Sequence, residues 1–107
     1  MKNNANLCGL IGIATKAGKI VCGTDACLEQ IHKGNVNLIL IAQDCSDRTK
    51  TKFNQVAKDF NVPIYTVLSI EEMSKVMGKQ NKAVVGIKDA GFSNKIINMI
   101  NGGEYIG

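Results

Sequence analysis

Aromatic side chains are scarce in this 107-residue chain, which has no tryptophan, two tyrosines and three phenylalanines. Proteins that bind single-stranded nucleic acids stack successive bases on exposed aromatic side chains. The composition therefore argues against an open base-stacking platform.

Arginine and histidine each occur once, as Arg48 and His32, so lysine supplies nearly all of the positive charge. A lysine binds phosphate as a point charge and lacks the planar fork that reads guanine edges. The formal charge of +4, from 13 basic and 9 acidic residues, permits a nucleic-acid partner without requiring one. No nucleophile or orienting group can be assigned beside His32, which we interpret as a solvated residue at a helix end.

Metal-ligand spacing and long hydrophobic runs are also missing. The cysteines lie at positions 8, 22, 27 and 45 without a CxxC pair or a histidine cluster, so we expect reduced, mostly buried thiols and no metal site. The apolar stretch from Leu7 to Ala14 is broken by Gly9 and Gly12, and it is too short to span a membrane. It also has no clear signal cleavage site, so we expect a cytoplasmic protein without membrane contact.

A single proline, no low-complexity run and 45% apolar residues indicate one folded domain, which we place at 1–101 with a tail at 102–107. Apolar periodicity and capping residues predict five helices. The first two lie at about 4–17 and 24–33, and the third is capped by Ser46. The fourth runs from the Ser69 capping box to Met77, and the fifth contains Phe92, Ile96 and Met99. Strands are predicted at 20–22, 36–42, 64–67 and 83–87.

Helices and strands therefore alternate along the whole chain. This order predicts an α/β fold, a three-layer α/β/α sandwich around a four-stranded, mainly parallel or mixed sheet. Ligands of such sheets lie beyond the strand ends, among the loops that enter helices.

The turn Gly23-Thr24-Asp25-Ala26 joins a predicted strand directly to a predicted helix. The first amides of a helix have no partner within the helix and lie at the positive end of its dipole. Together with flanking lysines, such amides form a site for phosphate. An anionic ligand is therefore the first expectation for this turn.

Other candidate sites are weaker. The stretch from Gly12 to Lys19 looks like a nucleotide-binding loop, but it has five residues between its glycines where the motif has four, and it follows a helix and not a strand. Cys27, near a helix start, is either a reactive thiol of a small-molecule enzyme or a buried residue, and burial is the commoner reading. Asp44 and Asp47 are interpreted as structural.

The chain resembles the kink-turn RNA-binding proteins typified by archaeal ribosomal protein L7Ae, and in particular their small bacterial YlxQ-like members. The resemblance covers nearly the whole length, and it depends on the order of its landmarks. These are Ala14-Thr15-Lys16-Ala17-Gly18-Lys19, Gly23-Thr24, Leu38-Ile39-Leu40-Ile41-Ala42 followed by Asp44 and Ser46, Val62-Pro63, Gly78-Lys79, and Ile87-Lys88-Asp89-Ala90-Gly91-Phe92.

The resemblance implies a contact surface built from the start of the second helix and from the loop Lys79-Gln80-Asn81-Lys82-Ala83. In the family, the glycine turn is followed by asparagine and glutamate, then by a lysine and a further basic residue. The matching positions here are Asp25, Ala26, Glu29 and Lys33. Two carboxylates thus stand where an amide and a lysine usually meet RNA, although Asp25 can still accept a hydrogen bond from a guanine amino group.

The resemblance thus implies non-catalytic binding of structured RNA, of the kink-turn kind, without cofactor or small-molecule substrate. Exposed chain ends and a modest charge favour a monomer. The amides of Gly23 and Thr24 and the side chain of Asp25 would meet the kinked base pairs, with Gln80 and Asn81 supporting the loop. A basic rim would hold backbone phosphates; it consists of Lys16, Lys19, Lys33, Lys79 and Lys82. The alternative that the two carboxylates leave open is a protein-interaction module of the same fold without RNA affinity.

Overall fold

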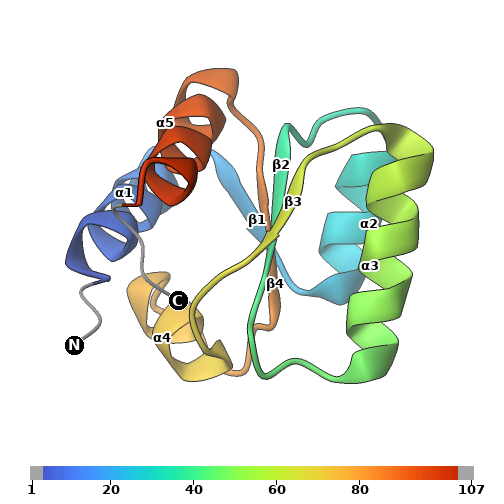
Figure 1. Ribbon diagram of the computed structural model, residues 1–107, viewed down its shortest axis with the longest axis horizontal. Helices are drawn as coiled ribbons and strands as arrows, with labels where there is room; N and C mark the ends of the chain where they lie inside the picture. The colour runs from blue at the N-terminus through green and yellow to red at the C-terminus, as the bar shows by residue number, and fades with distance from the viewer. Residues whose placement is uncertain (1–3, 104–107) are drawn as a thin grey trace.

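A computed structural model describes residues 4–103 and contains five helices and four strands in strict alternation (Figure 1). The elements are α1 (Ala5–Lys16), β1 (Ile20–Cys22), α2 (Thr24–His32), β2 (Leu38–Ile41), α3 (Asp47–Phe60), β3 (Ile64–Thr66), α4 (Ile70–Val76), β4 (Val84–Ile87) and α5 (Ala90–Asn101). Each predicted element is present, with ends that differ by a few residues. Of the predicted tail at 102–107, residues 104–107 lie outside the described part of the chain.

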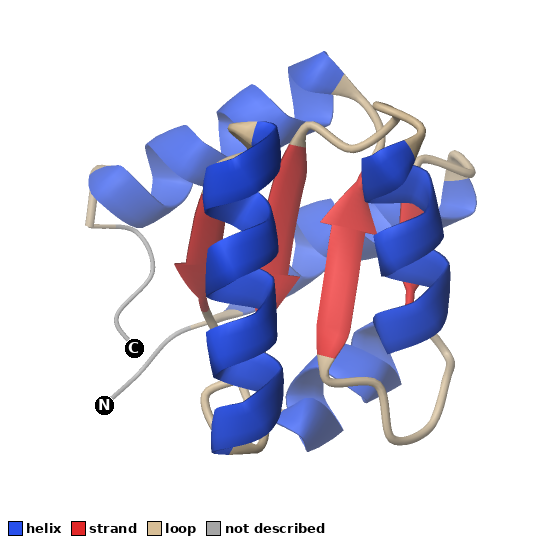
Figure 2. Cartoon of the chain, turned by 90° about the vertical axis from the view of Figure 1, so that its right-hand side faces the viewer, coloured by secondary structure: helices blue, strands red, loops and turns tan. Residues whose placement is uncertain are grey.

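The helices form two layers, one on each face of the sheet. Helices α1, α4 and α5 lie on one side in Figure 1, and α2 and α3 lie on the other. Figure 2 shows α2 and α3 in front of the strands. The predicted α/β/α sandwich is therefore confirmed.

The sheet is mixed, with strand order β1-β4-β2-β3. Strand β2 pairs with β3 in parallel, whereas β4 is antiparallel to both β1 and β2. The long helix α3 carries the chain back along the sheet before β3. The seven-residue helix α4 stays at the end where β3 finishes (Figure 1), so β4 enters the sheet from that end and runs the opposite way.

The two central strands form the middle of the core, because all residues of β2 and β4 are buried. Such continuous apolar runs are typical of strands covered on both faces. Gly86 in β4 is required by this packing, since a Cβ there would lie 2.9 Å from Val21 Cγ1 and 3.3 Å from both γ-methyls of Val36. Val21 and Val36 thus leave no room for a side chain at position 86.

Capping interactions fix where several helices begin. Ser46 Oγ accepts a hydrogen bond from the Thr49 amide, and Ser69 and Glu72 form the predicted capping box. The Ile70 amide also donates to Asp44 Oδ1 at 2.8 Å, which confirms the structural role expected of Asp44. These bonds position α4 and hence the loop that follows it.

The strand directions define two ends of the sheet. We call the region of Gly23–Ala26 and Lys79–Ala83 the turn end, because β1 stops there and β4 begins there. We call the region of Gly18–Lys19, Gly34–Asn37 and Lys88 the far end, because β1 begins there and β4 stops there. Among residues 4–103, no helix has the length and apolar character needed to cross a membrane.

Candidate nucleic-acid interface

Gly23 makes the passage from β1 into α2 possible. Its φ of 94° and ψ of 153° lie in a region of backbone conformation that is essentially restricted to glycine. Its amide donates to the Val84 carbonyl at 2.9 Å, and its carbonyl accepts from the Cys27 amide at 3.0 Å. Because a glycine N-cap has no side chain, the first amides of α2 remain available to an external acceptor.

The side chain of Lys82 lies over this glycine. A Cβ built on Gly23 would be 3.6 Å from Lys82 Nζ, so the ammonium group stands directly beside the start of α2. A cation beside the positive end of a helix dipole is unfavourable unless an anion shares the site. The predicted convergence of the glycine turn and the loop before the last strand is therefore present, and it concentrates positive potential.

The loop that carries Lys82 is fixed by a residue that sequence reasoning missed. Ser74, in α4, accepts a hydrogen bond from the Lys82 amide at 2.8 Å and donates to the Lys82 carbonyl at 3.3 Å. The one signal in the sequence was a serine beside Met73 on the buried side of a short amphipathic helix. Its partner, eight residues away, could not be read from spacing.

Other residues of the loop surround a hollow of about 600 Å³ next to Ser74. Lys79, Gln80 and Asn81 line it together with Asp44, Ile70, Glu71 and Lys75. Asn81 has a φ of 56°, the left-handed conformation that asparagine tolerates in tight turns. The predicted loop residues thus gather around one concave surface.

The two unexpected carboxylates have different surroundings. Asp25 lies in the first turn of α2, where a negative charge is favoured by the helix dipole. Glu29 lies one turn further on and forms an exposed ion pair with Lys33, with 3.6 Å between Oε1 and Nζ. Lys33 therefore lies at the opposite end of α2 from Gly23 and offsets part of the charge of Glu29.

The remaining lysines of the predicted rim do not lie beside the glycine turn. Lys19 precedes β1, and its carbonyl accepts from the Lys88 amide at 2.7 Å at the far end. Lys16 closes α1, which runs into the same end. Strand β1 and helix α2 separate the two ends, and the helix alone has nine residues, or about 13 Å. The single rim expected from the sequence is therefore two groups of lysines, and Lys79 and Lys82 are the members at the turn end.

The thiol beneath the turn is buried. Cys27 has no exposed surface, and its Sγ lies 3.5 Å from the Val21 carbonyl oxygen. Burial raises the pKa of Cys27 to about 12, with the neighbouring Cys22 adding to the rise and a backbone hydrogen bond at Gly86 opposing it. The thiolate needed for nucleophilic chemistry is thus strongly disfavoured, and burial, the commoner reading of this cysteine, is confirmed.

His32 has the surroundings expected of a residue at a helix end. It is exposed, its Nδ1 lies 2.8 Å from the Leu28 carbonyl oxygen, and its ring stands edge-on to Phe60 with centroids 4.8 Å apart. Within residues 4–103, no three histidine, cysteine or acidic side chains gather in a way that would hold a metal ion.

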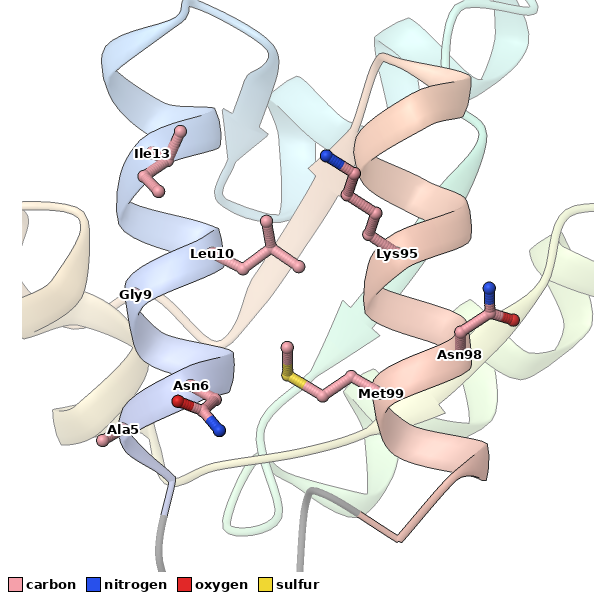
Figure 3. A pocket seen from close by; sticks show the side chains of 8 residues that line it. All are labelled: Ala5, Asn6, Gly9, Leu10, Ile13, Lys95, Asn98 and Met99. Atoms are coloured by element: carbon pink, nitrogen blue, oxygen red, sulfur yellow. The ribbon is translucent and has the colours of Figure 1, made fainter.

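A second hollow, of about 550 Å³, lies between α1 and α5, away from the glycine turn (Figure 3). Leu10 and Met99 point toward each other across it, and Lys95 lies along its α5 side. Ile13, at its edge, is 58% exposed. Its lining includes the apolar side chains of Ala5, Leu10, Ile13 and Met99.

An α/β/α domain whose glycine-led helix start is covered by a lysine has the chemistry of an anion-binding surface. The chain belongs to the ribosomal protein L7Ae/L30e/S12e/Gadd45 family, whose sequence profile matches residues 5–97. Membership of this family is thereby confirmed, and two relatives confirm the likeness to its YlxQ-like members.

Two similar proteins are both named RNA-binding protein YlxQ. The protein from Bacillus subtilis (strain 168) is 32% identical over 92 residues, which are 86% of this chain and 92% of the relative. The protein from Enterococcus faecium is 32% identical over 100 residues, which are 94% of this chain and 96% of the relative. The similarity thus extends over nearly the full length of both relatives.

Solved structures show the same architecture. A protein of unknown function from Bacillus halodurans C has a TM-score of 0.87 and 28% identity, covering 91% of this chain and 98% of that one. A 15.5kD RNA binding protein from Giardia lamblia has a TM-score of 0.74 and 20% identity, covering 92% of this chain and 84% of that one, and it shows the common fold alone.

Proposed function

We propose that this protein binds structured RNA through the turn end, with kink-turn motifs as its targets and without catalysing a reaction. The observation that carries the proposal is the Lys82 ammonium group held beside the uncapped start of α2. Family membership and the names of the two YlxQ relatives support RNA as the anion. A ribosomal or other structured RNA in the cytoplasm would be the natural setting, with the protein acting as a monomer.

The residues of the turn end have distinct roles in this proposal. The first amides of α2, which follow Gly23 and begin with that of Thr24, would face the kinked base pairs. The Asp25 carboxylate would face them as well and accept a hydrogen bond from a guanine amino group. Lys79 and Lys82 would hold backbone phosphates on either side of Gln80 and Asn81. Contacts to phosphate position the RNA, and contacts to base edges provide the preference for the kink.

A titration against two RNAs tests the proposal. One RNA contains a kink-turn, and in the other Watson–Crick pairs replace the sheared G·A pairs. The proposal expects tighter binding to the kinked RNA at physiological salt. Equal, weak binding to both would leave only the electrostatics of lysines and would refute kink-turn recognition.

The competing function is a protein-interaction module, and the observation that favours it is the apolar hollow between α1 and α5 with its exposed Ile13. The preference of the unmodified protein for the kinked RNA separates the two functions, and Ile13→Lys is the control at the hollow. RNA binding at the turn end predicts unchanged affinity for the kinked RNA, because Ile13 lies on a different helix pair. The interaction module predicts no RNA preference in the unmodified protein and no effect of the substitution on RNA.

A further inference from the structure

We infer that Ser74 is a positioning residue, which holds the loop Lys79–Lys82 in its RNA-binding shape before the RNA arrives. The inference rests on the proposed function of the turn end and adds to it a residue that itself need not touch RNA. It concerns the hydroxyl group of Ser74 and not the volume of the side chain.

Ser74 holds both ends of the loop. Its backbone carbonyl accepts from the Lys79 amide at 2.8 Å, which closes the turn after α4. Its hydroxyl accepts from the Lys82 amide at 2.8 Å and donates to the Lys82 carbonyl at 3.3 Å. One residue thus fixes the first and the last member of a four-residue loop.

The bonds to Lys82 continue into the sheet. The next residue, Ala83, accepts at its carbonyl from the Ala42 amide at 2.9 Å, and Val84 accepts from the Gly23 amide at 2.9 Å. Three consecutive residues are therefore attached to three different elements: Lys82 to α4, Ala83 to the end of β2, and Val84 to the glycine turn. Without the Ser74 hydroxyl, the backbone of Lys82 loses both of its hydrogen bonds to α4.

Packing alone does not explain why position 74 is a serine. The residue is 4% exposed in the middle of a short helix, where serine is a poorer helix former than alanine. A serine inside a helix commonly bonds back to a carbonyl four residues earlier. Here the hydroxyl instead bonds to Lys82, eight residues later in the chain. The lower helix propensity of serine is therefore offset by the order that these bonds give to the loop.

Preformed loops bind more tightly because less conformational entropy is lost on association. Two hydrogen bonds to Lys82 therefore raise RNA affinity without any contact between Ser74 and RNA. The loss of one net hydrogen bond corresponds to a few-fold change, so removing the hydroxyl should weaken binding about three- to tenfold.

Four variants test the inference. Ser74→Ala removes the hydroxyl, Ser74→Cys keeps the shape with a weaker hydrogen-bonding group, and Ser74→Thr keeps the hydroxyl. Ser93→Ala is the matched control, because Ser93 is 1% exposed and its Oγ has no hydrogen-bond partner within residues 4–103. The readouts are affinity for the kinked RNA at a temperature where every variant is folded, and hydrogen exchange of the Lys82 amide.

The expected result is weaker RNA binding and faster exchange at Lys82 for Ser74→Ala and Ser74→Cys, with recovery in Ser74→Thr and no change in Ser93→Ala. Unchanged RNA affinity in Ser74→Ala would overturn the inference while leaving RNA binding intact. Wild-type affinity in Ser74→Cys would overturn it as well, because packing would then suffice. If the unmodified protein did not prefer the kinked RNA, the proposed function would fail first and the inference with it.

Discussion

The two ends of the sheet carry lysines in different settings. At the turn end, α2, α3 and α4 begin, and Lys82 is held beside an uncapped helix start by a buried serine. At the far end, α1, α2 and α3 finish, and α5 begins with its first turn capped by Asp89. Helix starts favour anions and helix ends favour cations. The far-end lysines therefore complement the helix dipoles of the protein itself, whereas the turn-end lysines add to a positive potential.

The number of lysines is thus a poor guide to where RNA binds. A lysine on a fixed loop, next to free amides, can hold a phosphate at a defined place. A lysine at an exposed helix end mainly contributes long-range attraction, which salt screens. We expect specificity from the turn end and only general electrostatic attraction from the far end.

The thiol beneath the turn end should differ most from an ordinary residue of its kind. Because the pKa of Cys27 is raised from 9.0 to about 12, its thiolate fraction at neutral pH is about a thousandfold lower than that of an unperturbed cysteine. Labelling with a thiol reagent should therefore modify the half-buried Cys22 long before Cys27. Labelling of Cys27 as fast as a free cysteine would revive the enzymatic alternative.

The same thiol gives a pH dependence with a defined sign. Because the folded state raises the pKa of Cys27, it favours the neutral thiol, and this contribution to stability is complete below about pH 9. It should be lost as the pH rises from about 9 toward 12, since the unfolded chain ionises first. Urea denaturation across this range, compared with Cys27→Ser, would measure the effect.

Glycines at the two ends provide the next comparison. Gly23 and Gly34 have φ values of 94° and 76°, so alanine at either position should cost stability, on the order of 1–3 kcal/mol. Only Gly23→Ala should also lower affinity for the kinked RNA, by about tenfold or more, because it moves the helix start and the Lys82 side chain. Equal RNA affinities for the two variants would mean that the turn does not contact RNA.

Lysines at the two ends make a smaller but cleaner contrast. Lys82→Gln should reduce the slope of log affinity against log salt by about 0.7–0.9 and weaken the preference for the kinked RNA. Lys88→Gln should leave that preference unchanged, because Lys88 is at the far end beside Lys19. Binding to both RNAs, measured from low to physiological salt, distinguishes the two lysines; a loss of preference in Lys88→Gln would contradict the division between the ends.

The smallest effect is expected from the carboxylate of the turn. Asp25→Asn removes a negative charge near the phosphates while keeping an oxygen that accepts a hydrogen bond. Affinity for the kinked RNA should rise by about twofold, with the gain decreasing at higher salt. A fall in affinity would show instead that the charge of Asp25 takes part in recognition.

Much of the fold was accessible from the sequence because it is encoded locally. Ser46 and the Ser69–Glu72 capping box mark helix starts within a few residues, and the aliphatic run around Leu40 marks a buried strand. The direction of β4 was left open because it depends on α4 staying at one end of the sheet, which no local pattern states. Local sequence patterns therefore predict the helices and strands better than the directions in which the strands pair.

The candidate site was accessible only in part. The glycine-led helix start and the loop around Lys82 were predicted, and the structure places them together. The role of Ser74 and the separation of Lys19 from Lys82 were not, because both depend on which residues meet across α4, β1 and β4. Contacts between elements distant in sequence are set by the packed fold, and spacing along the chain does not record them.

Mapping the RNA footprint by NMR chemical shifts would show whether RNA binds at the turn end. The account predicts that a kink-turn RNA shifts the amides of Gly23–Ala26 and 79–82 most strongly, while the same RNA with Watson–Crick replacements produces only weak, dispersed changes. The largest shifts at the far end, or along the hollow between α1 and α5, would contradict it.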